Sequence, residues 1–307
     1  MKKKDILVVT GPTATGKTKL AARIATLTGG EIISADSRQV YRGMTIGTGK
    51  DLDDYIVDGV RVPCHLIDIC EPGYRYNLFE FQRDFVSAYN DIISRDKMPL
   101  LCGGTGLYVE AAIKEYRLLK VPPDHNFRKE MEKLTLDELT EILSSYRKLH
   151  NRSDSDSVKR AVRAIEIERY MANHVTDTQE SLCLDYLLFV IEIDRDLRRE
   201  RITRRLYQRL DEGMVEEVEG LLKSGVAPDI LLYYGLEYKY ITQHLTGELN
   251  HNEMVSRLET AIHRFSKRQM TWFRGMERRG LKVNWLDGTL SDNAKADIII
   301  SKLNDTL

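Results

Sequence analysis

Ile6-Leu7-Val8-Val9-Thr10-Gly11-Pro12-Thr13-Ala14-Thr15-Gly16-Lys17-Thr18 is the stretch of this 307-residue chain that decides its fold. A short apolar run ends at the pattern G-x-x-x-x-G-K-[ST], which covers Gly11 to Thr18. Apolar residues then recur at helical spacing, at Leu20, Ala21, Ile24 and Leu27. A strand before this pattern and a helix after it are the context of a phosphate-binding loop, so we predict strand, loop and helix here.

The residue types of the loop suit a bound anion. Its glycines let successive backbone N–H groups turn toward one phosphate group, and the following helix N-terminus adds partial positive charge. Lys17 adds a full positive charge, and the Thr18 hydroxyl is a candidate ligand for Mg²⁺. The pattern does not identify the molecule that carries the phosphates, because unrelated functions share it.

The first interpretation of such a loop is that the protein is a small-molecule kinase. A kinase usually needs an acidic residue near the metal at a strand end, and Asp68 is the candidate, with a cap or turn role as the alternative.

Five further apolar runs predict the rest of the sheet: Glu31–Ala35, Cys64–Ile69, Pro99–Cys102, Leu187–Ile193 and Lys282–Leu286. Runs that are apolar on both faces suit buried parallel strands with helices between them, and Leu78–Arg95 is one such helix. We therefore predict an α/β protein with a P-loop NTPase-like, three-layer α/β/α fold around a parallel sheet.

Residues 122–183 interrupt this alternation of strands and helices. The sequence there is charged, contains no apolar run typical of a strand, and has helical patterns at Arg128–Lys133, Leu136–Leu149 and Val158–Met171. We predict a helical insertion domain at 122–183, and an α/β core made of 1–121 and 184–307.

Composition favours a soluble globular protein in the cytoplasm, with 42% apolar and 30% charged residues. No run approaches the roughly 20 apolar residues of a membrane span, so no membrane partner is expected. The apolar run after Lys2–Lys4 is too short for a signal peptide. The four cysteines lack metal or disulfide spacing and are expected to be ordinary thiols.

Two segments that follow predicted strands carry candidate chemistry. Asp36-Ser37-Arg38-Gln39 follows the second run, where ligands of a doubly wound fold lie, so Asp36 would face the phosphate loop and accept a proton there. A turn or cap aspartate is the alternative. Gly103-Gly104-Thr105-Gly106 follows the fourth run; its glycines would allow close backbone approach to a ligand, and Thr105 offers a hydroxyl.

Cations are concentrated although the net charge is −1. A solvated helix face is the usual explanation of such runs, but acids are sparse within both, which favours a polyanion such as RNA. The two clusters are Arg195, Arg198, Arg199, Arg201, Arg204, Arg205 and Arg209, and Arg264, Lys267, Arg268, Arg274, Arg278 and Arg279.

Six blocks in this order resemble the tRNA dimethylallyltransferase (IPP transferase) family, in its bacterial form because no zinc-finger extension follows Phe273. The resemblance covers nearly the whole chain. The blocks are Gly11–Thr18, Asp36–Gly43 with Ile46-Gly47-Thr48, His65–Asp68, Gly103–Tyr108, Arg160 with Arg163–Glu166, and Lys267–Arg274.

The resemblance implies a prenyl transfer. In this family the loop holds the diphosphate of dimethylallyl diphosphate, and the prenyl group passes to N6 of the adenosine 3′-adjacent to the tRNA anticodon. It implies that Asp36 is the general base, that Thr105 lies beside the reacting centre and that Arg205 grips the diphosphate. Mg²⁺ is the expected cofactor, with Thr18 as its ligand.

The resemblance also implies contacts with the tRNA anticodon stem-loop, whose target adenosine must leave its stack to react. We expect a monomer. The implied tRNA-binding residues are Asp36, Ser37, Arg38, Gln39, Arg128, Lys159, Arg160, Arg163, Lys267 and Arg268.

Two segments depart from the family pattern. Gly49-Lys50-Asp51 stands where Ala-Lys-Pro is common, and Gly235-Leu236-Glu237 stands near a Gly-Tyr-basic element that touches tRNA. The second departure puts that contact in doubt. The alternatives to tRNA prenylation are prenylation of a free adenine nucleotide and small-molecule phosphorylation.

Overall fold

The computed structural model describes residues 4–114, 118, 120–146, 156–173 and 182–305. The chain divides into two compact units, Met1–Tyr116 with Ser181–Leu307, and Arg117–Glu180. The insertion domain was predicted at residues 122–183, within and just beyond the second unit. Each unit is described by itself.

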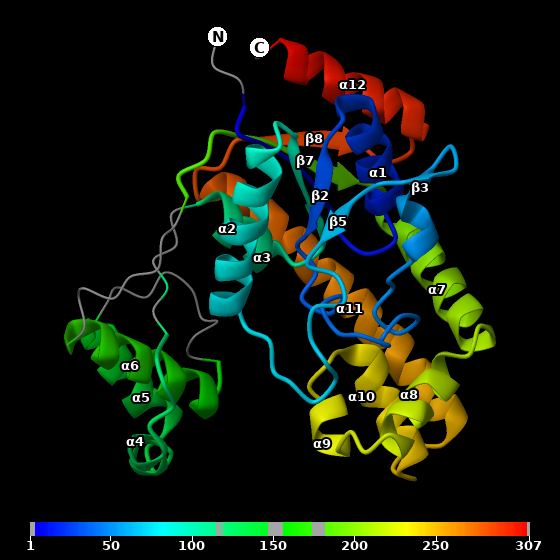
Figure 1. Cartoon of the computed structure of the whole chain (residues 1–307). Coiled ribbons are helices and arrows are strands. Elements are labelled where there is room, and N and C mark those ends of the chain that lie inside the picture. The colour runs from blue at the N-terminus through cyan, green and yellow to red at the C-terminus, as the bar shows by residue number, and fades with distance from the viewer. Residues whose placement is uncertain (1–3, 115–117, 119, 147–155, 174–181, 306–307) are drawn as a thin grey trace. The chain divides into compact units, whose positions relative to one another are not determined.

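The first unit is built on a six-stranded sheet with the order β5-β2-β6-β1-β7-β8 (Figure 1). Every neighbouring pair is parallel, and β1 at the centre pairs with both β6 and β7. The sheet confirms the predicted α/β fold and all six predicted strand positions. The strands are β1 Ile6–Thr10, β2 Glu31–Ser34, β5 Cys64–His65, β6 Pro99–Gly103, β7 Tyr186–Glu192 and β8 Val283–Asp287.

Strand β5 is shorter than predicted. The apolar run from Cys64 to Ile69 was expected to be strand throughout, but only Cys64–His65 pairs with β2. Leu66 and Asp68 adopt left-handed backbone conformations, with φ of 63° and 54°, which an extended ladder excludes. A small hairpin, β3 (Ile56–Val57) with β4 (Val60–Arg61), was not predicted.

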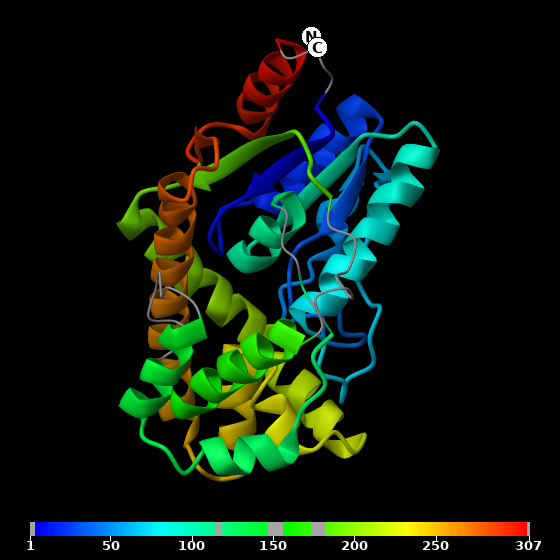
Figure 2. The same ribbon diagram turned by 90° about the vertical axis from the view of Figure 1, so that its left-hand side faces the viewer.

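Helices cover both faces of the sheet and complete three layers (Figure 2). Alternate strand residues point to opposite faces, so Leu7 and Val9 enter one core while Ile6 and Val8 enter the other. The first core holds α1 (Lys17–Thr28) and α12 (Asp292–Asn304). The second holds α2 (Leu78–Ser94), α3 (Gly106–Ile113) and α11 (His251–Arg278).

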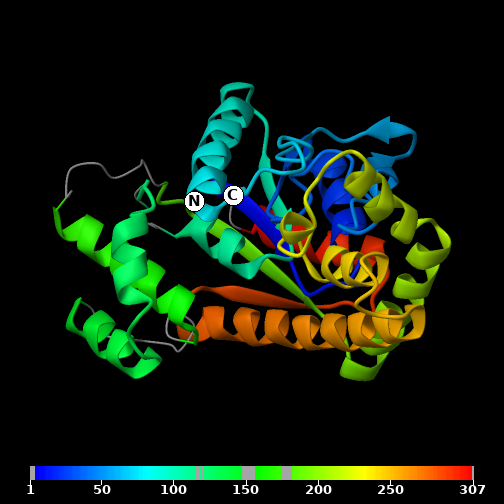
Figure 3. The same cartoon turned by 90° about the horizontal axis from the view of Figure 1, so that it is seen from below.

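The helix predicted over Leu78–Arg95 is confirmed as α2, which ends at Ser94 with Arg95 as its C-cap. Helix α11 spans 28 residues, and Figure 3 shows it as one unbroken rod. The remaining helices of this unit are η1 Leu52–Tyr55, α7 Arg195–Asp211, α8 Met214–Lys223, α9 Pro228–Leu231 and α10 Leu236–Leu245. Within the described residues, no helix is long and apolar enough to cross a membrane.

The described residues of the second unit form helices joined by turns and loops, and none of them forms a strand. It contains α4 (His125–Met131), α5 (Leu136–Tyr146) and α6 (Val158–Asn173), close to the three helices predicted there. Residues 147–149 of the second predicted helix lie outside the described residues. Leu139 and Leu143 of α5 and Ala161, Val162 and Ile165 of α6 form a small apolar core of its own.

Gly103 at the end of β6 tests how tightly the sheet is packed. A Cβ atom there would lie 2.3 Å from the carbonyl carbon and oxygen of Ala35, so Gly103→Ala forces two strands apart. We expect the variant to lose about 1–3 kcal/mol of unfolding free energy, the usual cost of overpacking, as measured by urea denaturation.

The matched control is Gly220→Ala in α8, where an added Cβ meets nothing within 4 Å. Because alanine is the better helix former, this variant should gain about 0.5–1 kcal/mol. Equal stability of the two variants would contradict the packing argument.

Candidate active site

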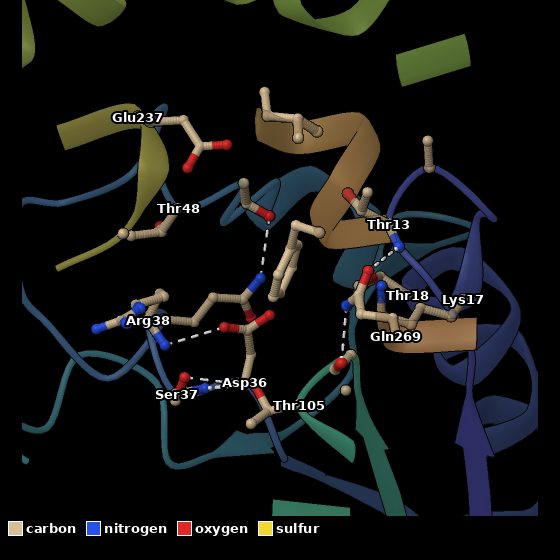
Figure 4. A pocket seen from close by; sticks show the side chains of 18 of the residues that line it. Thr13, Lys17, Thr18, Asp36, Ser37, Arg38, Thr48, Thr105, Glu237 and Gln269 are labelled. Carbon is tan, nitrogen blue, oxygen red and sulfur yellow. Dashed lines mark hydrogen bonds between the residues drawn. The ribbon is translucent and has the colours of Figure 1, made fainter. Parts of the chain in front are cut away.

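A pocket of about 520 Å³ opens at the carboxyl ends of β1, β2 and β6, where the fold predicts a ligand site (Figure 4). Its wall comes from distant parts of the first unit: the loops after these three strands, the start of α1, η1, helices α7 and α11, and the start of α10 with the two residues before it. The two glycine-containing segments singled out in the sequence therefore lie in one cavity.

The phosphate loop has the conformation that its pattern predicts. Ala14 and Gly16 have positive φ values of 65° and 74°, and α1 begins directly afterwards, at Lys17. Gly11, Pro12 and Thr15 form the buried base of the loop, where the Thr15 hydroxyl donates to the Pro12 carbonyl over 2.9 Å. The other five predicted residues line the pocket: Thr13, Ala14, Gly16, Lys17 and Thr18.

Three cations line the pocket at this loop: Lys17 of the loop itself, and Arg205 and Arg209 of α7. Burial lowers the pKa of Lys17, and the charges of Arg205 and Arg209 lower it further, against the opposing effect of Asp36. Burial and Arg209 likewise lower the pKa of Arg205 to about 10. Arg205 donates to the Thr13 hydroxyl, which holds its guanidinium against the loop. A wall that gathers buried cations in this way suits an anionic ligand.

Asp36 projects into the pocket from the end of β2 (Figure 4). Its Oδ1 accepts the backbone N–H of Arg38 over 2.9 Å, which fixes the carboxylate as in a turn. Within the described part of the chain Asp36 forms no ion pair. One oxygen thus holds the side chain in the turn, and the other accepts no hydrogen bond from the described residues.

Thr105 lies beside this turn. Its hydroxyl accepts the N–H of Ser37 over 3.2 Å and donates to the Ser37 hydroxyl at 3.4 Å. These bonds connect the end of β6 to the end of β2. Thr105 therefore orients the segment that carries Asp36, and it also lines the pocket.

The glycines around Thr105 line the pocket, where they were expected to let a ligand approach the backbone, and they also make room for the chain itself. A Cβ at Gly106 would lie 2.3 Å from the Trp272 ring. One at Gly104 would lie 2.9 Å from Nε2 of Gln269, and Gly103 abuts Ala35. The chain itself fills the space that the missing side chains leave.

Gln269 is a site residue that was not singled out from the sequence. Its Oε1 accepts the Thr13 N–H over 3.0 Å, and its Nε2 donates to the Gly104 carbonyl over 2.8 Å (Figure 4). One buried amide thus joins the phosphate loop to the loop after β6. A buried glutamine on an otherwise apolar helix face was the available signal.

Asp68 was one candidate for a strand-end acid near a metal, with a cap or turn role as the alternative, and it does not line the pocket. Its carboxylate pairs with Lys50, whose ammonium also donates to the Tyr41 carbonyl over 2.6 Å. Lys50 is fully buried, and a buried cation needs such partners. Asp68 neutralises Lys50 instead of serving the site.

The departure at Gly49-Lys50-Asp51 shapes one wall. Gly49 has a φ of 66°, and a Cβ there would lie 2.8 Å from the Arg209 guanidinium. Asp51 pairs with that guanidinium over 3.1 Å. The loop is further held by Glu217 of α8, which accepts the N–H groups of Thr45, Ile46 and Gly47. Sequence reasoning missed Glu217.

The second departure lies in the pocket. Gly235, Leu236 and Glu237 all line it, and Figure 4 shows the Glu237 carboxylate on the side opposite the phosphate loop. Burial raises the pKa of Glu237, against the lowering effects of Arg209, Arg205 and Arg38. The segment therefore lines the site, but with an acidic side chain where the family pattern has a basic one.

The implied tRNA-binding residues occupy different surroundings. Asp36, Ser37, Arg38, Gln39 and Arg268 line the pocket, whereas Lys267 does not. In the second unit Arg128 and Arg163 both pair with Glu166, which is 4% exposed. The Arg128 pair joins α4 to α6, whereas Arg163 pairs within α6 and also donates to the Val121 carbonyl over 3.0 Å. Neither role was foreseen from the sequence. Arg160 pairs with Asp156, and Lys159 is exposed.

Fold and site together define a P-loop-type α/β protein whose pocket is lined by cations and by one carboxylate from the end of β2. A model of the IPP transferase family matches residues 39–276, and one of isopentenyl transferases matches residues 4–64.

Similar proteins agree. The chain is 55% identical to tRNA dimethylallyltransferase 2 of Bacteroides fragilis over 301 residues, 98% of each chain. It is also 55% identical to tRNA dimethylallyltransferase 1 of Parabacteroides distasonis over the full length of both. Among solved structures, the tRNA isopentenylpyrophosphate transferase of Bacillus halodurans has a TM-score of 0.71 at 31% identity, and covers 99% of this chain and 98% of its own. The chain belongs to the IPP transferase family, which confirms the resemblance.

Gln269→Leu tests the amide bridge. Leucine is of similar size but makes neither bond, so the Thr13 N–H and the Gly104 carbonyl lose their partner. We expect unfolding free energy to fall by about 1–3 kcal/mol, and pyrophosphate to bind more weakly because the loop is no longer anchored. Chemical denaturation and calorimetric titration measure the two effects.

Gln243→Leu is the matched control, because among the described residues the Gln243 side chain bonds only the exposed Glu248, at 3.0 Å. Its stability should stay within about 0.5 kcal/mol of the parent. Unchanged pyrophosphate affinity in Gln269→Leu would disprove the anchoring role.

Proposed function

We propose that this chain transfers a dimethylallyl group from dimethylallyl diphosphate to N6 of the adenosine 3′-adjacent to the anticodon of tRNA, and releases diphosphate. The names of its relatives support this, and one observation carries it. A cationic phosphate loop and the Asp36 carboxylate, free of ion pairs within the described residues, line the same pocket.

The cationic side of the pocket suits a departing diphosphate. As the bond between the allylic carbon and the diphosphate oxygen breaks, negative charge grows on the leaving group. Lys17, Arg205 and the loop N–H groups are in place before this happens, so no reorganisation is needed to stabilise the charge. The allylic carbon tolerates cationic character, so no covalent nucleophile of the protein is required.

The acidic side suits the acceptor. The exocyclic amine of adenine is a poor nucleophile, and it must lose a proton as its nitrogen bonds the allylic carbon. Asp36 is the base that takes this proton, because its second oxygen faces the pocket while Oδ1 is anchored by Arg38. Thr105 keeps the Asp36 segment in position through Ser37.

The pocket volume fits this pair of substrates. About 520 Å³ lies within the range of roughly 300–1,000 Å³ typical of small-molecule sites, which accommodates a flipped base beside a five-carbon chain. Arg38, Gln39 and Arg268 line the pocket and are the proposed contacts to the nucleotides that flank this base. In the second unit, exposed Lys159 and Arg160 are proposed to contact the stem-loop, and Arg128 and Arg163 to support them.

Mg²⁺ fits the donors present. The Thr18 hydroxyl lines the pocket and, among the described residues, makes no hydrogen bond, so it is free to be a ligand. The described residues contain no group of three metal-binding side chains, which suits a magnesium ion held mainly by diphosphate oxygens and water. When bound, it would neutralise charge on the diphosphate.

We further propose that the protein acts as a monomer in the cytoplasm.

The direct test is incubation with dimethylallyl diphosphate and unmodified tRNA, followed by digestion and chromatography for N6-prenyl adenosine. A protein that modified only AMP in a competition with tRNA would be a free-nucleotide transferase. Phosphoryl transfer from ATP without prenyl transfer would make it a kinase.

Asp36→Asn tests the base. The amide keeps the size of the carboxylate but cannot take the amine proton, so we expect kcat to fall by about 10²–10⁴-fold with little change in the KM for the donor. Steady-state prenylation assays measure both.

Asp53→Asn serves as the control, since Asp53 is exposed and does not line the pocket. It should retain full activity. If the Asp36→Asn variant kept a kcat above a tenth of the parental value, Asp36 would not be the general base.

The lowered pKa of Lys17 predicts a pH dependence. A lysine with a lowered pKa loses its proton below the usual 10.5, so its attraction for diphosphate declines as pH rises toward that value. Calorimetric titration with pyrophosphate from pH 7 to 10 should show affinity falling as pH rises. Lys17→Met should bind weakly at every pH and lack this step, and an identical pH profile in the two proteins would refute the assignment.

A further inference from the structure

A second cavity, of about 900 Å³, lies along the face of α11 that is turned away from the pocket described above. Helix α11 separates the two. Residues such as Ile262, Phe265 and Gln269 line the first pocket, whereas His263, Ser266 and Met270 line the second. The other walls of the second cavity, here called the α7–α11 groove, come from α7 and the ends of β7 and β8.

The groove is rich in cations that both helices supply. The acids along it are already engaged: Glu192 pairs with Arg274 over 2.6 Å, Asp194 accepts the Asp196 N–H over 2.7 Å, and Asp287 accepts the Thr289 N–H over 2.8 Å. Its other cations form no ion pair within the described residues. They are Arg195, Arg198 and Arg199 of α7, and Arg264 and Lys267 of α11.

Two polar atoms in the groove wall also lack a partner. Ser266 is 1% exposed, and in the part of the chain that the structure describes neither its Oγ nor the buried Nδ1 of His263 has a hydrogen-bond partner. Buried polar atoms in native proteins are nearly always satisfied, so an orphan hydroxyl and an orphan ring nitrogen in a cationic cavity point to a polar ligand.

The cations do not stop at the edge of the groove. Lys267 lines the groove and its neighbour Arg268 lines the first pocket, while the Arg268 guanidinium lies over the exposed Phe265 ring at 5.8 Å. Along α11, Arg264 and Arg274 are ten residues apart, roughly 15 Å at the usual helical rise. One phosphate group cannot span this length, whereas a chain of phosphates can.

We propose that the α7–α11 groove binds the sugar–phosphate backbone of the RNA whose base enters the first pocket. The proposal rests on the proposed function and adds to it a second, sequence-independent contact surface. Contacts of this kind set the register of the nucleic acid on the protein. The backbone would cross the ridge of α11 at Phe265 and Arg268, and its phosphates would meet Arg264, Arg198 and Arg199.

The test replaces the three arginines Arg198, Arg199 and Arg264 by glutamine in one variant. The matched control removes the same charge from exposed sites outside both cavities, as Arg61→Gln, Lys97→Gln and Lys223→Gln. Thermal melting checks that both variants fold. The KM for tRNA and for dimethylallyl diphosphate, kcat at saturating tRNA, and the salt dependence of tRNA binding are then measured.

We expect the groove variant to raise the KM for tRNA by about tenfold or more, and to reduce the slope of log K against log salt by roughly 2–3, as for three lost phosphate contacts. Its kcat and its donor KM should stay parental, because the reaction pocket is intact. The control should behave like the parent.

Three results would overturn the proposal. The groove variant could retain the parental tRNA KM and salt slope, or the control could weaken tRNA binding equally, which would reduce the effect to net charge. The variant could also lose only binding of inorganic phosphate or pyrophosphate, followed by calorimetry, which would assign the groove to a free anion. If the parent protein prenylates no tRNA, the proposed function fails first, and this outcome is separate from all three.

Discussion

The close approach of β2 and β6 at their carboxyl ends is the constraint on which the site depends. No Cβ fits between Gly103 and the backbone of Ala35, so the segments that follow the two strands emerge side by side. Thr105 then bonds Ser37, and the turn that carries Asp36 is held. Gln269 ties the same region to the phosphate loop. Because only a glycine fits at Gly103, β2 and β6 approach closely, and this approach brings the Asp36 carboxylate and the cations of the phosphate loop into one pocket.

The charges of the molecule divide into those that neutralise one another and those that do not. Asp68 satisfies the buried Lys50, and Glu166 satisfies Arg128 and Arg163, so these groups stabilise the fold. Lys17 and Arg205 have no acid paired with them in the described residues, and burial, together with the neighbouring Arg209, lowers the pKa of both. In the proposed reaction a diphosphate would neutralise these two cations.

Much of the fold could be predicted because its signals are local. Six apolar runs predicted six strands, and the pattern from Gly11 to Thr18 predicted the loop and α1. The prediction failed where local pattern and backbone geometry disagree: the run from Cys64 continues, but left-handed Leu66 ends the strand. Residues that act through distant partners were missed for a related reason. Gln269 and Glu217 bond segments about 165 and 170 residues away, which no local pattern records.

The sequence alone determined the parallel sheet, the phosphate loop, the helical insert and, through six ordered blocks, the family, because each depends on residue types at short spacing. Only the tertiary structure decided which charges are paired and which remain for a ligand, and that the glycines around Thr105 make room for Ala35, Gln269 and Trp272. It also decided that the two arginine-rich stretches meet in one groove beside α11. These outcomes depend on distances between segments far apart in the chain, and packing sets those distances.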